Sequence, residues 1–493
     1  MNLRPIMFVG TCSDAGKSLL NTAFCRIFLQ DGYRPAPFKA QNMSLNSYST
    51  PDGGEIGRAQ AVQAEACGIM PHTDMNPVLL KPSTDQTSQV VLNGRPVGNM
   101  SAREYFRSGN KQQLWEEAVG AFHRLAAHYN PIVLEGAGSI SELNLRDRDI
   151  TNMRMAREVG AATYLVADID RGGVFASVYG SVMLLPEEER RLLKGILINK
   201  FRGDISLFDE GRRLIEELTG VPVVGVIPYF RDVHIEEEDS VALENKASTA
   251  QSGKINVAVV RLKRLSNFTD FNVLEHDSRF HLYYTDEVAE IEKADIVILP
   301  GTKNTIADLQ LIRTNGVADA VVRAYRKGKK VIGICGGYQM MGVSVEDPDH
   351  VEGDTDTVAG LGLLPLVSVM QQRKVVCQSE FCFKGSEAVC KGYQIHMGIT
   401  FPVSEAGPAV REINTLPEGT TEGSWLDDCC WGSYMHGILD NGVVLDDLAH
   451  GFSCPSAGTF DYAAFKEEQY DLLARHVREV VDMEYIYSTL SMS

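Results

Sequence analysis

The stretch IMFVGTCSDAGKSLL, residues 6–20, decides the fold of the first half of the chain. An apolar run of strand type ends at Gly10, and the residues from Lys17 onward have helical spacing. A strand, a glycine-containing loop and a helix start form an anion site, because backbone N–H groups and the helix dipole point at the same place. Residues 10–18 therefore predict a phosphate loop.

Each polar residue of this loop has a predicted task. Gly10 and Gly16 shape the loop, Lys17 reaches the outer phosphates of ATP, and Ser18 places its hydroxyl on Mg²⁺. Five residues separate the two glycines, one more than in the common loop. The alternative is a glycine turn followed by an ordinary helix cap.

Apolar strands alternate with helical stretches through residue 230. This order predicts an α/β fold with a parallel sheet that is covered on both faces. The expected strands are 6–10, 34–39, 131–138, 162–169, 195–201 and 221–229, and the expected helices are 55–69, 114–128, 151–159 and 206–219.

Three further polar residues lie at the ends of these strands, where ligands bind in such sheets. Lys39 could stabilise charge on a transferring phosphoryl group. Glu135 could hold Mg²⁺ or its waters. Asn199 could contact an adenine edge, or it could cap the local backbone.

A charged and then Ser/Ala/Gln-rich segment, residues 234–254, interrupts the alternation and predicts a linker. The expected domains are thus 1–233 and 255–440, the second also of α/β type. Residues 441–493 form a C-terminal extension whose helix, 463–481, is expected to pack on the second domain.

The second domain contains a candidate nucleophile in VIGICGGYQMMG, residues 331–342. Cys335 follows an apolar strand and precedes a helical stretch, so the thiol would be exposed on a tight turn at a helix N-terminus, which favours the thiolate. The N–H of Gly336 is one candidate oxyanion donor, and Gly301 or Thr302 in ILPGTKN (298–304) could supply the other. The alternative is a buried core thiol.

A cysteine nucleophile needs a base. His436 in WGSYMHGIL (431–439) and His396 in GYQIHMG (392–398) are the two candidates. Residue type and position alone leave this choice open.

Composition excludes several classes of protein. The 493 residues carry a formal net charge of −18, which argues against nucleic-acid or membrane-surface binding. No apolar run is long enough to span a membrane. Residues 1–11 lack the basic region and the long apolar region expected of a signal peptide. The ten cysteines are scattered without a CxxC pair, as in a reduced, cytoplasmic protein.

The two halves each resemble a known class of enzyme. The phosphate loop is similar to that of the dethiobiotin-synthetase branch of P-loop enzymes, which includes partition-type ATPases. The cysteine turn with a distant histidine resembles a class I glutamine amidotransferase, although Ile438 stands where that class usually has a glutamate. The stretch Tyr434-Met435-His436-Gly437 matches a variant that uses a Cys-His pair, which favours His436.

Both classes in one chain resemble the cobyric acid synthase family. The segments that carry this resemblance are FKAQNMSLNS (38–47), DGGEIGRAQ (52–60), EGAGSISELNL (135–145), DRGGVFAS (170–177) and NKFRGD (199–204). The resemblance implies ATP- and glutamine-dependent amidation of the b, d, e and g carboxylates of adenosylcobyrinic acid a,c-diamide. It also implies that the polar stretch 41–60 binds the corrinoid through Gln41, Asn42 and Arg58, with Lys39 as a further counter-charge.

Two other functions fit parts of this pattern. A cobyrinic acid a,c-diamide synthase would have the same domains and amidate other carboxylates. A partition-type ATPase with an inactive amidotransferase domain would be an interaction protein, and an intact Cys335 and His436 argue against it.

Overall fold

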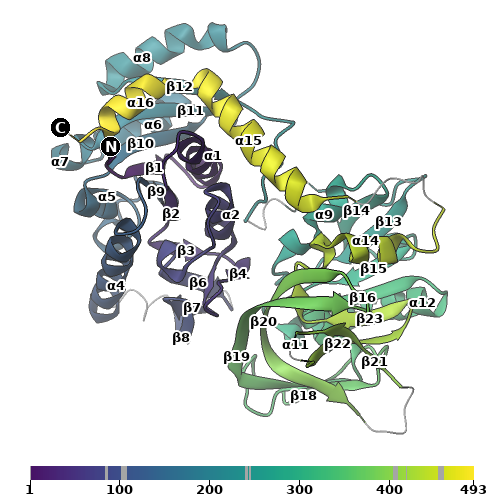
Figure 1. The fold of residues 1–493 in the computed structure, drawn as a ribbon. Helices are drawn as coiled ribbons and strands as arrows, with labels where there is room; N and C mark the ends of the chain where they lie inside the picture. The colour runs from purple at the N-terminus through teal and green to yellow at the C-terminus, as the bar shows by residue number, and fades with distance from the viewer. Residues whose placement is uncertain are drawn as a thin grey trace. The chain divides into compact units, whose positions relative to one another are not determined.

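The computed structural model describes residues 2–83, 87–101, 108–238, 243, 246–403, 409–417, 419–453 and 460–492 (Figure 1). Cys454 and part of the expected linker lie outside these ranges. The chain forms two compact units. The first comprises Met1–Ser44, Ile56–Glu236 and Ala464–Ser493, and the second comprises Leu45–Glu55 and Glu237–Ala463.

A six-stranded parallel sheet forms the centre of the first unit, in the order β12-β11-β10-β1-β9-β2. Every strand predicted in this half is present, so the expected α/β fold is confirmed. The strands are β1 (Ile6–Gly10), β2 (Ala36–Phe38), β9 (Ile132–Glu135), β10 (Ala162–Asp168), β11 (Leu193–Phe201) and β12 (Val223–Pro228).

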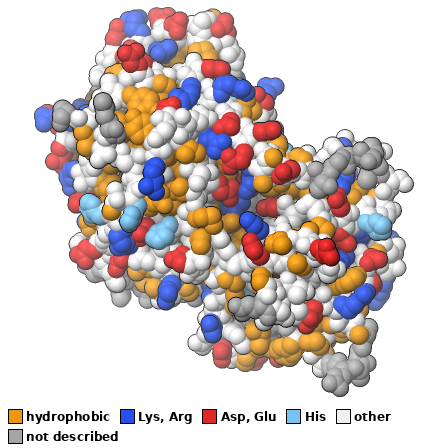
Figure 2. All heavy atoms as spheres, in the orientation of Figure 1, with side chains coloured by type: hydrophobic (Ala, Val, Ile, Leu, Met, Phe, Trp, Pro, Cys, Tyr) orange, Lys and Arg blue, Asp and Glu red, His pale blue; other side chains and the backbone are white. Residues whose placement is uncertain are grey.

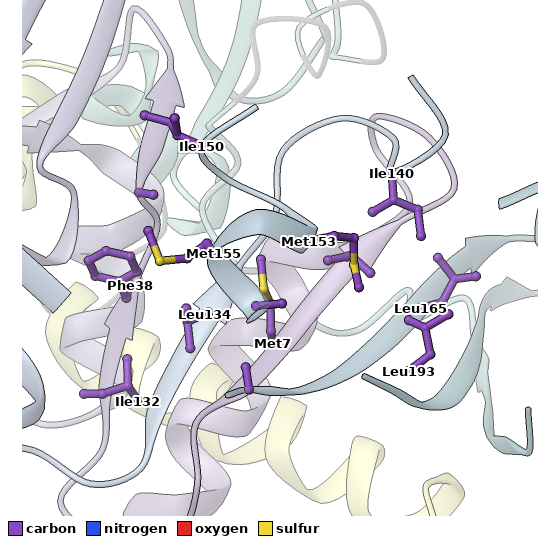
Figure 3. Close-up of a cluster of buried hydrophobic side chains, with 14 of the residues drawn as sticks. Met7, Phe38, Ile132, Leu134, Ile140, Ile150, Met153, Met155, Leu165 and Leu193 are labelled. Carbon is purple, nitrogen blue, oxygen red and sulfur yellow. The ribbon is translucent and has the colours of Figure 1, made fainter. Parts of the chain in front are cut away.

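Both faces of this sheet are buried, because successive side chains of a strand point to opposite faces. Met7 of β1 belongs to one apolar cluster, with Leu165 and Met153, and Phe8 belongs to the other. Figure 3 shows the first cluster, in which side chains of strands and of the α5 region meet. The helices of this unit are α1 (Lys17–Gln30), α2 (Arg58–Ala66), α4 (Ser108–Ala126), α5 (Met153–Val159), α6 (Val174–Met183), α7 (Glu187–Arg190) and α8 (Asp209–Thr219).

The C-terminal helices correct one expectation. Helices α15 (Tyr462–Val480) and α16 (Met483–Leu490), expected on the second domain, pack in the first unit. Leu473 joins the cluster around Phe8, and Asp482 N–H donates to Val224 O of β12 at 2.8 Å. The amphipathic pattern predicted the helix correctly, but such a pattern does not specify which apolar surface covers it.

A smaller, four-stranded sheet that the sequence pattern did not predict lies beyond the end of β2. Its order is β3-β6-β7-β8, formed by β3 (Gln41–Met43), β6 (Val78–Pro82), β7 (Thr87–Leu92) and β8 (Arg95–Ser101). Its first strand, β3, begins two residues after Lys39. The small sheet therefore holds in place the backbone that follows β2 at the carboxyl edge of the main sheet.

The second unit contains a mixed sheet whose parallel half has the order β14-β13-β15-β16-β23. These strands are β13 (Ile255–Val260), β14 (Phe280–Thr285), β15 (Ile296–Leu299), β16 (Lys330–Ile334) and β23 (Cys430–Ser433). The sheet continues through strands that are mostly antiparallel, namely β17 (Ser344–Glu346), β18 (Thr357–Ala359), β19 (Leu366–Phe383), β20 (Val389–Pro402), β21 (Arg411–Thr415), β22 (Thr421–Asp427) and β24 (Met435–His436).

Helices follow the parallel strands along the chain, and the carboxyl ends of these strands lie at one edge of the sheet. They are α9 (Asn272–His276), α10 (Val288–Ile291), α11 (Thr305–Thr314), α12 (Val317–Arg326), α13 (Gly336–Met341) and α14 (Gly442–Ala449). The segment Leu45–Glu55 also belongs to this unit, where Gln378 Nε2 donates to Ser49 O at 2.7 Å.

Charged side chains of both signs are spread over the described part of the face shown in Figure 2. Within the described ranges, no helix has the length and apolar character needed to cross a membrane.

Shortening Leu473 tests the docking of α15. Leu473 is fully buried in the cluster around Phe8. Leu473→Ala should therefore lower the free energy of unfolding of the first unit by about 2–5 kcal/mol, measured by urea denaturation. Arg475→Ala, on the exposed side of the same helix, is the control and should change it by less than about 0.5 kcal/mol. Equal effects of the two changes would contradict this packing.

Candidate functional site

The predicted phosphate loop connects β1 to α1, and its two glycines are required by close packing. A Cβ on Gly10 would lie 2.8 Å from Lys17 Nζ, and a Cβ on Gly16 would lie 2.0 Å from Asn199 Nδ2. Gly16 also has φ 97°, a left-handed conformation that side chains disfavour. The backbone therefore closes tightly around the space at the helix N-terminus.

Lys17 curls back over this loop. Its Nζ donates to Cys12 O at 2.9 Å and to Gly138 O at 3.1 Å. Burial lowers the pKa of Lys17 to about 8, with Glu135 opposing this shift and Lys39 adding to it. An incoming phosphate would favour the charged form of this lysine.

Glu135 connects the predicted residues to one another. Its carboxylate accepts from Ser18 Oγ at 2.8 Å, from Lys39 Nζ at 2.7 Å and from Gln63 Nε2 at 2.7 Å. Burial alone would raise the pKa of Glu135, but the charge of Lys39 and these hydrogen bonds hold it below its usual value. Gln63 is a member of this group that the sequence analysis missed, although it lies on a predicted helix.

The donor set suits a magnesium ion. Ser18 and Glu135 present hard oxygen atoms next to a phosphate loop, the kind of ligand Mg²⁺ takes together with water and substrate phosphates. Among the described residues no group of three or more His, Cys, Asp or Glu could hold a metal. Mg²⁺ bound to a nucleotide needs only one or two such groups.

Four other predicted residues have different surroundings. Asn199 is buried next to the loop, and its Nδ2 donates to Ala15 O at 2.8 Å, so its side chain supports the loop backbone. Asn42 donates to Gln60 Oε1 at 3.0 Å, and Gln41 lines a cavity described below. Arg58 forms a buried ion pair with Glu236, so the structure does not bring it to the phosphate loop.

Cys335 occupies the tight turn that the sequence predicted. It lies between β16 and α13 with φ 52° and ψ −112°, a strained conformation for a residue other than glycine. A Cβ on Gly337 would lie 1.9 Å from Leu299 O, so the turn packs directly on β15. The thiol is 7% exposed and lies at the start of the helix.

The candidate oxyanion donors lie beside this turn. A Cβ on Gly336 would lie 3.1 Å from the backbone N of Thr302, and one on Gly301 would lie 3.3 Å from His436 Cε1. Gly336 is the first residue of α13, whose N–H is not used within the helix. The N–H of Thr302 donates to none of the residues that the structure describes. The loops that hold Gly301, Thr302 and Gly336 are thus adjacent.

His436 is the histidine that contacts the thiol, and a carboxylate holds it in place. Cys335 is close enough to its ring to raise the imidazole pKa, and its Nδ1 lies 2.6 Å from Asp270 Oδ2. The thiol itself donates to Ile395 O at 3.5 Å. Asp270 Oδ1 also accepts from Gly437 N–H at 3.1 Å, and the ring of Tyr393 stacks on His436. The arrangement is a Cys-His-Asp triad in place of the Cys-His pair expected from the sequence.

The negative charge of Asp270 raises the pKa of His436. Burial would lower the pKa of His436, but the charges of Asp270 and Cys335 outweigh burial and raise it to about 10. A protonated imidazole next to Cys335 stabilises the thiolate, which is the reactive form of a cysteine. The group is able to form a thioester by nucleophilic attack.

His396 has partners other than Asp270 and Cys335. Its Nδ1 lies 3.1 Å from Gly398 O, its Nε2 lies 3.2 Å from Gln394 Oε1, and its ring stacks on Tyr434. Burial lowers its pKa to about 4, so it is neutral at neutral pH. The geometry favours His436 over His396 as the base.

Comparisons with known proteins cover both units. Residues 6–241 match the family model of the CobQ/CobB/MinD/ParA nucleotide binding domain, and residues 256–444 match that of the CobB/CobQ-like glutamine amidotransferase domain. Relatives named cobyric acid synthase are 67% identical in Parabacteroides distasonis, 62% identical in Bacteroides fragilis and 58% identical in Phocaeicola vulgatus. Each alignment covers 99% of this chain and 99% of the relative.

A nucleotide-binding unit and a cysteine amidotransferase unit in one chain define a glutamine-hydrolysing, ATP-dependent ligase. More specifically, the chain belongs to the cobyric acid synthase family. The resemblance drawn from the sequence is therefore confirmed. The two other functions that fit parts of the sequence are not favoured.

Replacing Asp270 tests the triad. In Asp270→Asn the carboxylate charge is lost, so the pKa of His436 should fall. The imidazolium that stabilises the thiolate form of Cys335 would then be less populated. We expect kcat/KM for glutamine hydrolysis to fall by about 100-fold or more. The alkaline limb of its pH profile should move to lower pH, because the imidazolium now loses its proton earlier.

The controls separate this role from a structural one. Asp270→Glu should restore part of the activity and of the alkaline limb, and Asp286→Asn, an exposed carboxylate in the loop after β14, should behave like the parent. An unchanged pH profile in Asp270→Asn would mean that Asp270 only supports the local fold.

Proposed function

We propose that this protein converts adenosylcobyrinic acid a,c-diamide to adenosylcobyric acid by amidating its b, d, e and g carboxylates, with ATP and glutamine as co-substrates. The observation that carries this proposal is that one chain of this family contains both centres the chemistry needs. One is a phosphate loop with two lysines around a buried carboxylate, and the other is a Cys-His-Asp group.

The ligase unit activates a carboxylate. A carboxylate oxygen attacks the γ-phosphorus of ATP, ADP leaves, and an acyl phosphate forms. Ammonia then attacks the acyl carbon, inorganic phosphate leaves, and a proton is released. Lys17 and Lys39 neutralise the negative charge that gathers on the phosphoryl group, which is the main catalytic requirement of such a transfer.

Mg²⁺ would be held by Ser18 and Glu135. When bound, it supplies charge neutralisation and orientation of the phosphates. Glu135 also orients Lys39, since the two atoms that form their ion pair are 2.7 Å apart. Asn199 supports the loop from behind, and Gln41 is a candidate contact for the corrinoid.

The amidotransferase unit supplies ammonia. Cys335 attacks the amide carbon of glutamine, and the N–H groups of Gly336 and Thr302 stabilise the oxyanion. His436 gives its proton to the leaving ammonia, and it then activates the water that hydrolyses the thioester. Asp270 keeps the imidazole in the orientation that both steps need, and it favours the protonated form from which the first step starts.

We assign the ligase chemistry to residues 1–233 and the glutaminase chemistry to residues 255–440, with 234–254 connecting them. Residues 464–493 complete the packing of the ligase unit. The nine described cysteines are all free, which supports a reducing, cytoplasmic location. The partners in this proposal are small molecules only.

Cys335→Ser separates the two centres. Serine is nearly isosteric but a far weaker nucleophile in this setting, so glutamine-supported amidation should fall by about 1,000-fold or more. Amidation from added ammonium chloride should continue, because the ligase residues are intact. Mass spectrometry of the corrinoid counts the amides, since each lowers the mass by about 1 unit.

Matched variants sharpen this test. His436→Ala should show the same split, whereas His396→Ala and Cys429→Ser should not. Loss of both nitrogen sources in Cys335→Ser would disprove the separation of tasks, and a parent enzyme that forms no amide would disprove the proposed reaction.

Glu135→Gln tests the magnesium site. The amide retains hydrogen bonds to Ser18 and Gln63 but removes the charge, so the Mg²⁺ concentration for half-maximal amidation should rise by about tenfold or more. Binding of ATP measured without metal should change less. Glu65→Gln removes a half-buried carboxylate of α2 that is paired with Lys466, and it should leave the metal titration unchanged. Overlapping titrations of Glu135→Gln and the parent would make Glu135 structural.

A further inference from the structure

A cavity of about 490 Å³ lies beside the phosphate loop, within the first unit. We call it the side cavity. The small sheet, the loop after β9 and the segment 146–154 enclose it. Much of its wall is apolar, contributed by Met43, Leu80, Val90, Met100, Leu145 and Met153. Met153 also belongs to the cluster shown in Figure 3, so this wall is anchored in the core of the unit.

The side cavity adjoins the phosphoryl-transfer centre through the loop after β9. Ala137 and Gly138 line the cavity, and Gly138 O is the atom that accepts from Lys17 Nζ. Asn152 holds this loop in place, because its side chain accepts from Ala137 N–H at 3.1 Å and donates to Ala137 O at 2.8 Å. A group bound in the cavity is thus separated from the phosphate loop by a single backbone layer.

Charged side chains of both signs line the cavity: Lys111, Arg146, Arg148 and Arg154 are basic, Glu142, Asp149 and Glu189 are acidic, and Arg146 is paired with Glu189. Arg154 is half-buried with its guanidinium 4.0 Å above the ring of Trp115, and it forms an ion pair with no carboxylate in the described part of the chain. Lys111 is 9% exposed and its Nζ donates to Arg148 O, and the exposed Arg148 is a third cation that lines the cavity. Burial lowers the pKa of Lys111 to about 8, an effect that Asp149 opposes and Arg148 and Arg154 reinforce. A further anion in the cavity would raise this pKa again, because it favours the charged form of the lysine.

A largely apolar cavity that also presents Arg154, which has no carboxylate partner in the described part of the chain, fits a ligand with an apolar body and acidic groups. A corrinoid acid has a broad apolar ring and several carboxylates on its periphery. The cavity is of a size that holds a drug-sized molecule, so it can receive one edge of so large a ring. Adenine, the other group that an ATP site must hold, carries no charge that would need these cations.

We propose that the side cavity binds one edge of the corrinoid, with Arg154, Lys111 and Arg148 pairing with peripheral carboxylates while another carboxylate faces Lys17 and Lys39. This inference rests on the proposed function and adds the place and chemistry of substrate recognition. Each amidation replaces one carboxylate by a neutral amide, so the attraction to these cations decreases from the first step to the last.

The experiment measures corrinoid binding apart from catalysis. Equilibrium dialysis with adenosylcobyrinic acid a,c-diamide, followed by its visible absorbance, gives the Kd without ATP or glutamine. Arg154→Met and Lys111→Met should each raise this Kd by about tenfold, the loss of one partly buried charge pair. The KM for ATP should change less than twofold.

Arg157→Met is the matched control. It lies on the same helix, α5, but it is exposed, pairs with Glu188 and does not line the cavity. It should bind the corrinoid as the parent does. Because Lys111→Met removes a buried cation, Lys111→Arg is a second variant that keeps the charge and should retain most of the affinity, with circular dichroism as the folding check.

The dependence of KM on the number of substrate carboxylates distinguishes substrate recognition by Arg154 from a structural role. In Arg154→Met the KM should rise most for the a,c-diamide and least for the substrate of the last amidation, which has only one carboxylate left to convert. A uniform rise over all steps would overturn the assignment. An unchanged corrinoid Kd with a raised KM for ATP would instead make the side cavity part of the nucleotide site.

Failure of this inference can be told from failure of the proposed function. A parent enzyme that amidates the corrinoid, with cavity variants that bind it normally, refutes the side cavity alone. A parent enzyme that forms no amide refutes both.

Discussion

The buried carboxylate of Glu135 is the interaction on which the ligase centre depends. It joins four elements, since its partners Ser18, Lys39 and Gln63 come from α1, from the end of β2 and from α2. A buried charge is stable only when it is paired and hydrogen-bonded, so each of these elements is held at a fixed position relative to β9. The same bonds keep Lys39 pointing toward the space above the phosphate loop.

A comparable constraint organises the amidotransferase centre, but here it is steric. The Cys335 turn packs so closely on β15 that Gly336 and Gly337 have no room for side chains. This close approach brings the Thr302 backbone next to the start of α13. Cys335 keeps its strained backbone conformation because the surrounding strands hold the turn in place, as is common at active sites, although the residue itself is buried rather than exposed as the turn predicted.

Local motifs predicted much of the site, because a phosphate loop and a nucleophile turn are each encoded by contiguous residues. Lys39 and Glu135 could be placed near the loop because the carboxyl ends of parallel strands share one edge. Asp270 could not be found in this way. It lies 166 residues before His436 in the sequence, and its position in the segment after β13 was its only signal.

Other differences have equally physical causes. Arg58 is predicted to be a counter-charge for the substrate, and the structure adds a partner, Glu236, that lies 178 residues away in the sequence and could not be read from local motifs. The small sheet has short strands, whose pattern is weak compared with that of the main sheet. The partner of an amphipathic helix is chosen by tertiary packing, which explains why α15 was assigned to the wrong unit.

The path of the backbone has a consequence for how the protein can be divided. The chain passes between the two units at residues 44/45, 55/56, 236/237 and 463/464. No single cut therefore yields two complete halves: a fragment ending near residue 233 lacks the helices that cover Phe8 and Phe24, and a fragment starting near 255 lacks the residues around Ser49. A circular permutant, or a pair of co-expressed fragments, would have to keep the segments of both units that these four crossings connect. For the same reason, a single recombination event cannot exchange one complete unit for that of another protein.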